Sequence, residues 1–289
     1  MSITIPGLTV KAPAKLNLHL AVKDRRPDGY HNLESVFLAL DFGDTLHFQL
    51  VPGQKTTEIV MEGLNFTLPI EKNIIFKALS LFREKTDLFE GLKIIVEKRI
   101  PPGGGLGGGS SDAASTLLAL NCLAGFPLKR GSLLEMAASL GSDVPFFIYK
   151  TAAARVSGRG ECIEPVEAPR CFFVLVNPGF PSDTAVAFRL LDEYRRAQNP
   201  HAEAQIARGG FWNDFLPVFK EPEKSVYNEI ISRLKELGAD FAGLSGAGST
   251  CFGVFKEREG AEKAAAALRG FGKWSFVECV CAGNLEKDQ

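Results

Sequence analysis

The sequence predicts an α+β protein with two domains, and three observations lead to this fold class. The chain has 289 residues, which is more than one domain of ordinary size requires. Segments that alternate apolar and polar residues, as strands do, are interleaved with segments whose apolar residues recur at helical intervals. A buried strand pattern begins anew after residue 160. We therefore predict one domain over residues 1–160 and a second over residues 161–289.

Composition indicates an ordinary globular protein, with 45% apolar and 23% charged residues. The net charge of −1 gives no general attraction to nucleic acid or to an anionic membrane, and we expect neither as a partner. No apolar run approaches the ~20 residues of a membrane span. The start of the chain has no signal-peptide pattern, so we expect a cytoplasmic protein whose six cysteines are reduced.

The first predicted strand covers Val10 to Val22, with leucines on one face and Lys15 and Asn17 on the other. From the strand alone, Lys15 is expected to be solvated. A polar loop and a turn follow, and they end at Tyr30 and His31. This aromatic pair could stack on a planar ligand, or it could form the half-buried shoulder of a hairpin.

Three further elements are predicted before the middle of the chain. Glu34 to Leu50 resembles a β-hairpin whose turn lies near Asp41–Asp44, where Gly43 would supply the permissive backbone. Asn73 to Lys85 has helical spacing, with Asn73 as the N-cap. Lys93 to Ile100 is predicted to be a strand, and it leads directly into a glycine-rich loop.

The glycine-rich loop is the most informative stretch of the chain. It consists of Pro101, Pro102, Gly103, Gly104, Gly105, Leu106, Gly107, Gly108, Gly109, Ser110 and Ser111. Glycine removes the side chains that would keep a ligand away from the backbone, and a loop of this kind before a helix is typical of phosphate binding.

Other interpretations of this loop are weaker. A Walker A loop would need a lysine where this chain has Ser110. Gly103, Gly105 and Gly108 formally satisfy the dinucleotide pattern G-x-G-x-x-G, but so many glycines satisfy almost any spacing. The interpretation that remains is a different nucleotide-phosphate loop, and the structural alternative to it is a flexible linker. The apolar strand and helix on either side argue against a linker.

Two helices are predicted after the loop. The first covers Asp112 to Ala124, with Ser110 or Ser111 as the N-cap. The second begins with a capping box at Ser132 and ends at Leu140. Asp143 follows at a joint between elements, where an N-cap role is the alternative to a functional role.

The second half of the chain continues the mixture of strands and helices. Its predicted strands are Cys171–Val176, Cys251–Phe255 and Phe276–Cys281, and its predicted helices are Thr184–Arg196, Val226–Leu237 and Gly260–Leu268. A second glycine cluster spans Leu244 to Ser249. Gln198 to Gly210 is polar, has no periodicity and receives no interpretation.

Four stretches occur in a fixed order: APAKLNLHL with a following DGYH, then PPGGGLGGGSSDAA, then LGSDVPFF, then LSGAGST. This order resembles the GHMP small-molecule kinases, over nearly the whole chain from Lys11 to Gly283. The resemblance implies a two-domain fold with an ATP-binding domain first, a smaller substrate-binding domain second, and the active site in the interdomain cleft.

The resemblance also implies residue roles. Asp143 would accept the proton of the substrate hydroxyl, with Lys15 and Asn17 beside the reacting centre. Residues 101–111 would wrap the ATP phosphates. Three residues would hold a cytosine: Tyr30, His31 and Phe188. A second glycine loop would support the phosphate loop, and it consists of Gly246, Ala247, Gly248 and Ser249.

Within the family, the motifs imply ATP and Mg²⁺ as cofactors and a cytidine diphosphate-linked methylerythritol as the small-molecule acceptor. A serine of the loop could hold the metal, but the sequence identifies no specific protein ligand, and it does not give the oligomeric state. The alternatives are another family member that acts on homoserine, mevalonate or a sugar, and a nucleotide-binding module without catalysis. A dinucleotide-dependent oxidoreductase is the last alternative function.

Overall fold

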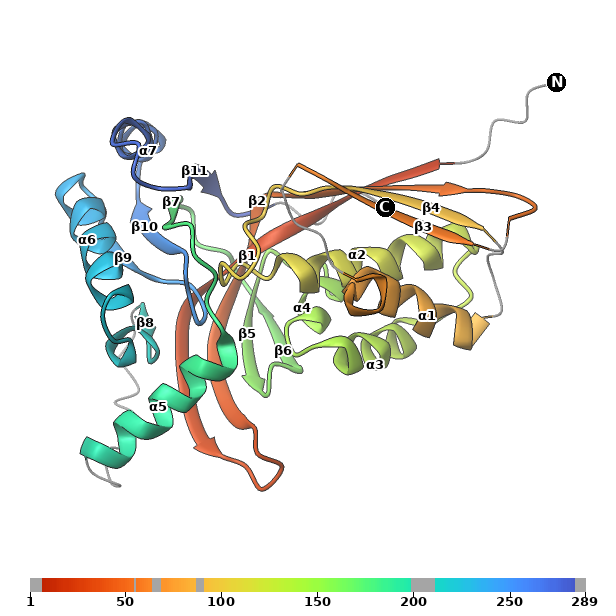
Figure 1. Ribbon diagram of the computed structural model, residues 1–289, viewed down its shortest axis with the longest axis horizontal. Helices are drawn as coiled ribbons and strands as arrows, with labels where there is room; N and C mark the ends of the chain where they lie inside the picture. The colour runs from red at the N-terminus through yellow and green to blue at the C-terminus, as the bar shows by residue number, and fades with distance from the viewer. Residues whose placement is uncertain (1–6, 55, 64–68, 87–90, 199–210, 284–289) are drawn as a thin grey trace. The chain divides into compact units, whose positions relative to one another are not determined.

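The computed structural model describes residues 7–54, 56–63, 69–86, 91–198 and 211–283. They form two compact units, each built from separate stretches of chain. Unit 1 comprises Met1–Ala14, Gly43–Ile100 and Gly107–Lys150, and unit 2 comprises Lys15–Phe42, Pro101–Leu106 and Thr151–Gln289. Figure 1 shows two long strands, β1 (Gly7–Arg25) and β2 (His31–Leu50). Each contributes residues to both units. The predicted boundary at residue 160 stays a prediction.

Unit 1 combines strands with a group of four helices (Figure 1). The second part of β2 pairs antiparallel with β4 (Leu92–Glu97), and β4 pairs parallel with β3 (Thr57–Glu62). A short 3₁₀ helix, η1 (Ile70–Lys72), precedes the helices, which are α1 (Ile74–Thr86), α2 (Gly108–Leu123), α3 (Arg130–Leu140) and α4 (Val144–Ile148). Helix α2 packs against the other three, and most of its residues are buried.

Unit 2 contains two groups of strands. The first part of β2 pairs antiparallel with β5 (Ala153–Gly158), which pairs with β6 (Cys162–Val166), and β1 pairs parallel with β8 (Trp212–Asn213). A separate antiparallel sheet has the order β11-β7-β10-β9. Its strands are β7 (Phe172–Asn177), β9 (Phe241–Leu244), β10 (Cys251–Phe255) and β11 (Phe276–Cys281).

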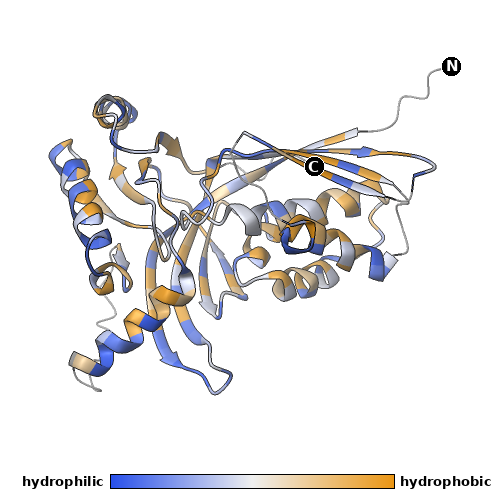
Figure 2. Cartoon of the chain, in the orientation of Figure 1, coloured by the Kyte–Doolittle hydropathy of each residue, from blue (hydrophilic) through white to orange (hydrophobic). Residues whose placement is uncertain are grey.

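The helices of unit 2 are α5 (Thr184–Gln198), α6 (Glu223–Glu236) and α7 (Arg258–Gly270), and η2 (Leu216–Val218) is a short 3₁₀ helix. Figure 2 shows mixed apolar and polar surfaces on α5 and α6. In α6 the buried residues Tyr227, Ile230 and Leu234 recur at intervals of three and four, so one face packs on β9 and β10. The predicted α+β mixture is confirmed.

The predicted hairpin at Glu34–Leu50 is wrong, because these residues belong to the single strand β2. Gly43 does not form a turn. A Cβ at this position would lie 2.3 Å from the carbonyl oxygen of Ala12, so glycine allows the backbone of β1 to approach closely. The aspartate that follows, Asp44, is fully buried instead of lying in a solvated turn.

The predicted starts of two helices are also wrong. Helix α2 begins at Gly108 after Gly107, whose φ of +69° suits glycine, so Ser110 and Ser111 lie inside its first turn and not at the N-cap. Helix α3 begins at Arg130, before the capping box predicted at Ser132. The predicted cap of α1 is confirmed, since Asn73 Oδ1 accepts a hydrogen bond from the Ile75 amide at 2.9 Å.

All six cysteines lie in the described ranges and are free thiols. Within those ranges, every helix is too short or too polar to cross a bilayer. The segment Gln198–Gly210 received no interpretation from the sequence. Its residues 199–210 lie outside the part of the chain that the structure describes.

Candidate active site

The first part of the glycine loop is fixed by hydrogen bonds to its carbonyl groups. The Ser182 amide donates to Gly103 O at 2.9 Å, and the Thr250 amide donates to Gly104 O at 3.1 Å. Ser245 Oγ donates to Gly105 O at 3.0 Å. The Lys15 amide donates to Leu106 O at 2.9 Å. Four successive carbonyl oxygens of the loop are therefore bound by the protein itself.

The second part of the loop is the start of helix α2. Gly107 is its N-cap, and the side chains of Ser110 and Ser111 follow in the first turn. The first amides of a helix have no partner within the helix, and the helix dipole adds positive charge there. Such an end attracts an anion, and the glycines leave the backbone accessible.

The second glycine cluster is close to the first part of the loop. Ser245 in this cluster and Thr250 directly after it make two of the hydrogen bonds described above. Within the cluster, Ala247 O accepts a hydrogen bond from Ser182 Oγ at 2.6 Å. A Cβ on Gly105 would lie only 2.2 Å from Ser245 O, so the two backbones are nearly in contact.

Lys15 is buried, with 4% of its surface exposed, so the expectation of a solvated strand lysine is wrong. Its ammonium donates to Asn17 Oδ1 and lies 4.7 Å from the centroid of the Phe37 ring. Asn17 is also buried, and its amide nitrogen Nδ2 donates to Ser35 Oγ at 3.0 Å. The Asn17 backbone amide donates to Ser245 Oγ at 3.3 Å, which links this strand to the glycine loop.

Asp143 occupies the position immediately before α4, but its side chain makes no capping hydrogen bond to that helix. The capping alternative to a functional role is therefore not supported by the geometry. The side chain is half-buried. A carboxylate at such a position can act as a general base toward a ligand hydroxyl.

His31 and Phe188 lie together in unit 2. Their rings are stacked, with centroids 5.1 Å apart and an interplanar angle of 15°. His31 Nε2 lies 3.0 Å from Asp192 Oδ1, one helical turn beyond Phe188 on α5. Sequence analysis missed Asp192, although its spacing of four residues from Phe188 puts both side chains on one face of the helix.

Tyr30 differs from His31, because it is 52% exposed. The guanidinium of Arg159 lies 3.9 Å from the centroid of its ring, a cation–π contact that sequence analysis also missed. Arg159 is held in the turn between β5 and β6, where its amide donates to Glu161 Oε2 at 2.6 Å. No pattern in the sequence connects Arg159 with Tyr30.

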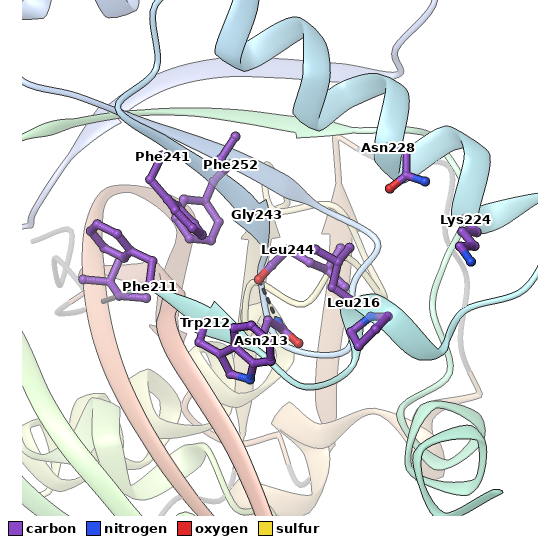
Figure 3. A pocket seen from close by; sticks show the side chains of 13 residues that line it. Phe211, Trp212, Asn213, Leu216, Lys224, Asn228, Phe241, Gly243, Leu244 and Phe252 are labelled. Atoms are coloured by element: carbon purple, nitrogen blue, oxygen red, sulfur yellow. Dashed lines mark hydrogen bonds between the residues drawn. The ribbon is translucent and has the colours of Figure 1, made fainter. Parts of the chain in front are cut away.

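A cavity of about 350 Å³ lies elsewhere in unit 2, between β8, β9 and α6 (Figure 3). Its walls are mainly apolar, and the rings of Phe211 and Phe241 stack there with centroids 4.8 Å apart. None of the predicted site residues lines it. Asn213 connects it to the second glycine cluster by donating to Leu244 O and Gly246 O at 2.7 and 2.8 Å.

In the described part of the chain, no group of three or more His, Cys, Asp or Glu side chains could hold a metal ion. The glycine loop and the start of α2 provide backbone amides for an anion, and β1 provides the buried polar side chains of Lys15 and Asn17. The chain also provides a carboxylate at Asp143 and an aromatic group at His31 and Phe188. This chemistry suits transfer of a phosphoryl group, in which positioning and charge neutralisation carry most of the catalysis.

Two family profiles match the chain. Residues 73–151 match the GHMP kinases N terminal domain, and residues 212–273 match the GHMP kinases C terminal family. A crystal structure of 4-(cytidine 5'-diphospho)-2C-methyl-D-erythritol kinase is similar, with a TM-score of 0.77 and 32% identity over 96% of this chain and 100% of that one. A homoserine kinase from Cytophaga hutchinsonii shares the fold at 20% identity and a TM-score of 0.68, covering 99% of this chain and 97% of that one.

Curated relatives carry the same name as the first of these structures. The chain is 40% identical to the 4-diphosphocytidyl-2-C-methyl-D-erythritol kinase of Xanthomonas axonopodis pv. citri, over 90% of this chain and 86% of the relative. It is 35% identical to the kinase of that name from Thermodesulfovibrio yellowstonii, over 91% and 95%. The chain therefore belongs to the GHMP kinases, in the family of the 4-diphosphocytidyl-2-C-methyl-D-erythritol kinases.

Proposed function

We propose that this protein transfers the γ-phosphoryl group of ATP to the 2-hydroxyl of 4-diphosphocytidyl-2-C-methyl-D-erythritol. The observation that carries this function is the 40% identity to a kinase of that name over nearly all of both chains. The resemblance to homoserine kinase extends to the fold alone, and no base-binding group would be needed for that acceptor.

In the proposed reaction the acceptor hydroxyl oxygen attacks the γ-phosphorus. The bond between that phosphorus and the oxygen bridging to the β-phosphate breaks, and ADP leaves. Asp143 accepts the hydroxyl proton as the general base. The buried ammonium of Lys15, oriented by Asn17, stabilises negative charge on the transferring group.

The glycine loop would bind the ATP phosphates through backbone amides. Support comes from its carbonyl groups, four of which are already bound by the protein. The start of α2 adds further amides and the positive end of the helix dipole. The loop itself offers no lysine for this purpose, so backbone groups would neutralise the phosphate charge.

Tyr30, His31 and Phe188 would bind the cytosine of the acceptor. A base site needs stacking surface and buried polar groups that match the edge of the ring. The stacked His31 and Phe188 rings already fill the space between them, so the base would lie on an outer face or displace one ring. The exposed Tyr30 ring offers a second stacking surface.

Mg²⁺ belongs to this proposal as well. Because the described residues contain no cluster of metal-binding side chains, the ion would be held mainly by phosphate oxygens and water, as Mg²⁺ often is. Its chemistry would be to neutralise phosphate charge.

The test is ADP release from ATP and Mg²⁺ with three acceptors in parallel: the cytidylated methylerythritol, homoserine and mevalonate. We expect ADP only with the first. ADP formed with homoserine or mevalonate instead, or with none of the three, would contradict the proposed substrate.

Asp143→Asn tests the proposed base. It keeps the size of the side chain but removes its ability to accept a proton, so we expect kcat to fall by about 10²-fold or more, with ATP affinity retained. Asp240→Asn is the matched control, since Asp240 is exposed and lies 3.7 Å from Lys256 in a surface ion pair. Near-normal turnover of folded Asp143→Asn would refute the assignment.

A further inference from the structure

Unit 1 contains a buried charged cluster in which Lys98 lies between two carboxylates. The side chain of Lys98 is 9% exposed, and those of Asp44 and Asp112 are 0% and 4% exposed. The ammonium donates to Asp44 Oδ2, and it donates to Asp112 Oδ2 at 2.6 Å. No proposed role in binding or catalysis above involves these three residues.

The cluster joins the two ends of the glycine loop. Asp44 Oδ1 accepts hydrogen bonds from the Arg99 amide at 2.6 Å and the Ile100 amide at 2.9 Å, and Ile100 is the last residue before the loop. Asp112 lies in the helix that begins at the other end of the loop. The path from one end to the other is therefore Ile100, Asp44, Lys98, Asp112.

The two loop ends also approach each other directly. A Cβ on Gly108 would lie 2.9 Å from Ile100 Cγ2, so the isoleucine packs against the start of α2. Such an apolar contact has no preferred direction. The hydrogen bonds of the cluster have fixed directions, and they add the orientation that the apolar contact lacks.

The cluster is costly to bury. Burial raises the pKa of Asp112 to about 7, against the effect of Lys98, and the two carboxylates raise the pKa of Lys98 although burial alone would lower it. Asp112 Oδ1 is buried and has no hydrogen-bond partner among the described residues. Apolar side chains of similar volume would often stabilise a fold equally well, so a buried ion pair is weak evidence for a role in stability.

We propose that Asp44, Lys98 and Asp112 form a clamp that fixes the two ends of the glycine loop and so positions its backbone amides for the phosphates of ATP. These are positioning residues, because they act through the backbone of residues 101–111. The inference rests on the proposed function only in naming ATP as the anion.

Asp44→Asn is the most direct test. The asparagine Oδ1 can still accept from the Arg99 and Ile100 amides, while its NH₂ group faces the Lys98 ammonium and breaks the ion pair. Lys98→Met removes the centre of the clamp. Asp112→Asn is milder, since its carbonyl oxygen can still accept from Lys98.

The readouts are the Kd of a fluorescent ATP analogue, the KM values for ATP and for the acceptor, and Tm. For Asp44→Asn and Lys98→Met we expect the ATP Kd and KM to rise about tenfold or more, with the acceptor KM within about twofold. Asp112→Asn should raise the ATP KM less. Lys93→Met is the matched control, because this lysine lies on β4, pairs with Glu58 at 3.1 Å on the surface and should leave ATP binding unchanged.

A purely structural role would lower Tm and kcat or raise both KM values together, and either pattern would overturn the clamp. An ATP Kd within about twofold of wild type in folded Asp44→Asn would also overturn it. If Lys98→Met does not fold, Asp44→Asn and Asp112→Asn still decide. If the wild-type protein binds ATP but phosphorylates no acceptor, the proposed function fails, while the binding data still test the clamp.

Discussion

Gly105 is the position at which the glycine loop should tolerate a side chain least. Its φ is +74°, which L-residues rarely adopt, and an added Cβ would lie 2.2 Å from Ser245 O and 2.8 Å from Gly248 O. Both contacts are with backbone, so no flexible side chain can move aside. Gly105→Ala must therefore shift either the loop or the second glycine cluster.

The loss of folding stability in Gly105→Ala has two sources, the left-handed backbone and the steric overlap. The left-handed backbone costs an alanine about 1 kcal/mol relative to glycine. The overlap requires a movement of more than about 1 Å in a packed region, and overpacking of this kind typically costs about 1–3 kcal/mol. Together they predict a loss of about 3 kcal/mol, or a decrease in Tm of roughly 6–12 °C for a chain of this size.

Thermal unfolding of Gly105→Ala measures this loss directly, and Gly109→Ala is the matched control. Gly109 lies in the first turn of α2, and its Cβ would meet only Ile74 Cγ2 at 3.7 Å, an ordinary contact. Alanine favours a helix over glycine by about 1 kcal/mol, so the control should keep or raise Tm. A Tm for Gly105→Ala within about 2 °C of wild type would refute the reasoning.

Two further predictions concern titration and base recognition. Burial raises the pKa of Asp112 to about 7, so the folded state binds a proton more tightly than the unfolded state does, and stability should fall as pH rises from about 4 to about 7. Asp112→Asn should flatten the dependence of the unfolding free energy on pH, which chemical denaturation at several pH values measures. An unchanged dependence in this variant would contradict the raised pKa of Asp112. Asp192→Asn should raise the acceptor KM several-fold and leave the ATP KM unchanged, because Asp192 orients the His31 ring. Steady-state kinetics that show both KM values rising together would contradict a role confined to the acceptor.

Local patterns predicted most of the elements and the place of the glycine loop. Asn73 capped its helix as expected, because a cap depends only on residues a few positions away. The start of α2 was misplaced because Gly107 in a left-handed conformation competes with Ser110 and Ser111 as the cap. The preference of serine for the N-cap therefore predicts a helix start poorly when several glycines precede the serine, because any of them can adopt the backbone conformation that begins the helix.

Features that depend on distant residues could not be predicted. Gly43 resembled a turn residue, but it serves the approach of Ala12, which lies 31 positions away in sequence. Lys15 resembled a solvated lysine because its burial depends on neighbours such as Phe37, which lies 22 positions away in sequence and whose ring centroid is 4.7 Å from the ammonium. The clamp joins residues 44, 98 and 112, and no spacing rule connects them.

The division of β1 and β2 between the two units has a consequence for how the protein is made. The chain passes from one unit to the other after Ala14, Phe42, Ile100, Leu106 and Lys150. Unit 1 therefore cannot be complete on the ribosome until Lys150 has emerged. The parts of β1 and β2 that belong to unit 2 can pair with β8 and β5 only after those later strands have been synthesised. Cutting the gene at any of these five crossings would leave at least one unit without part of its chain.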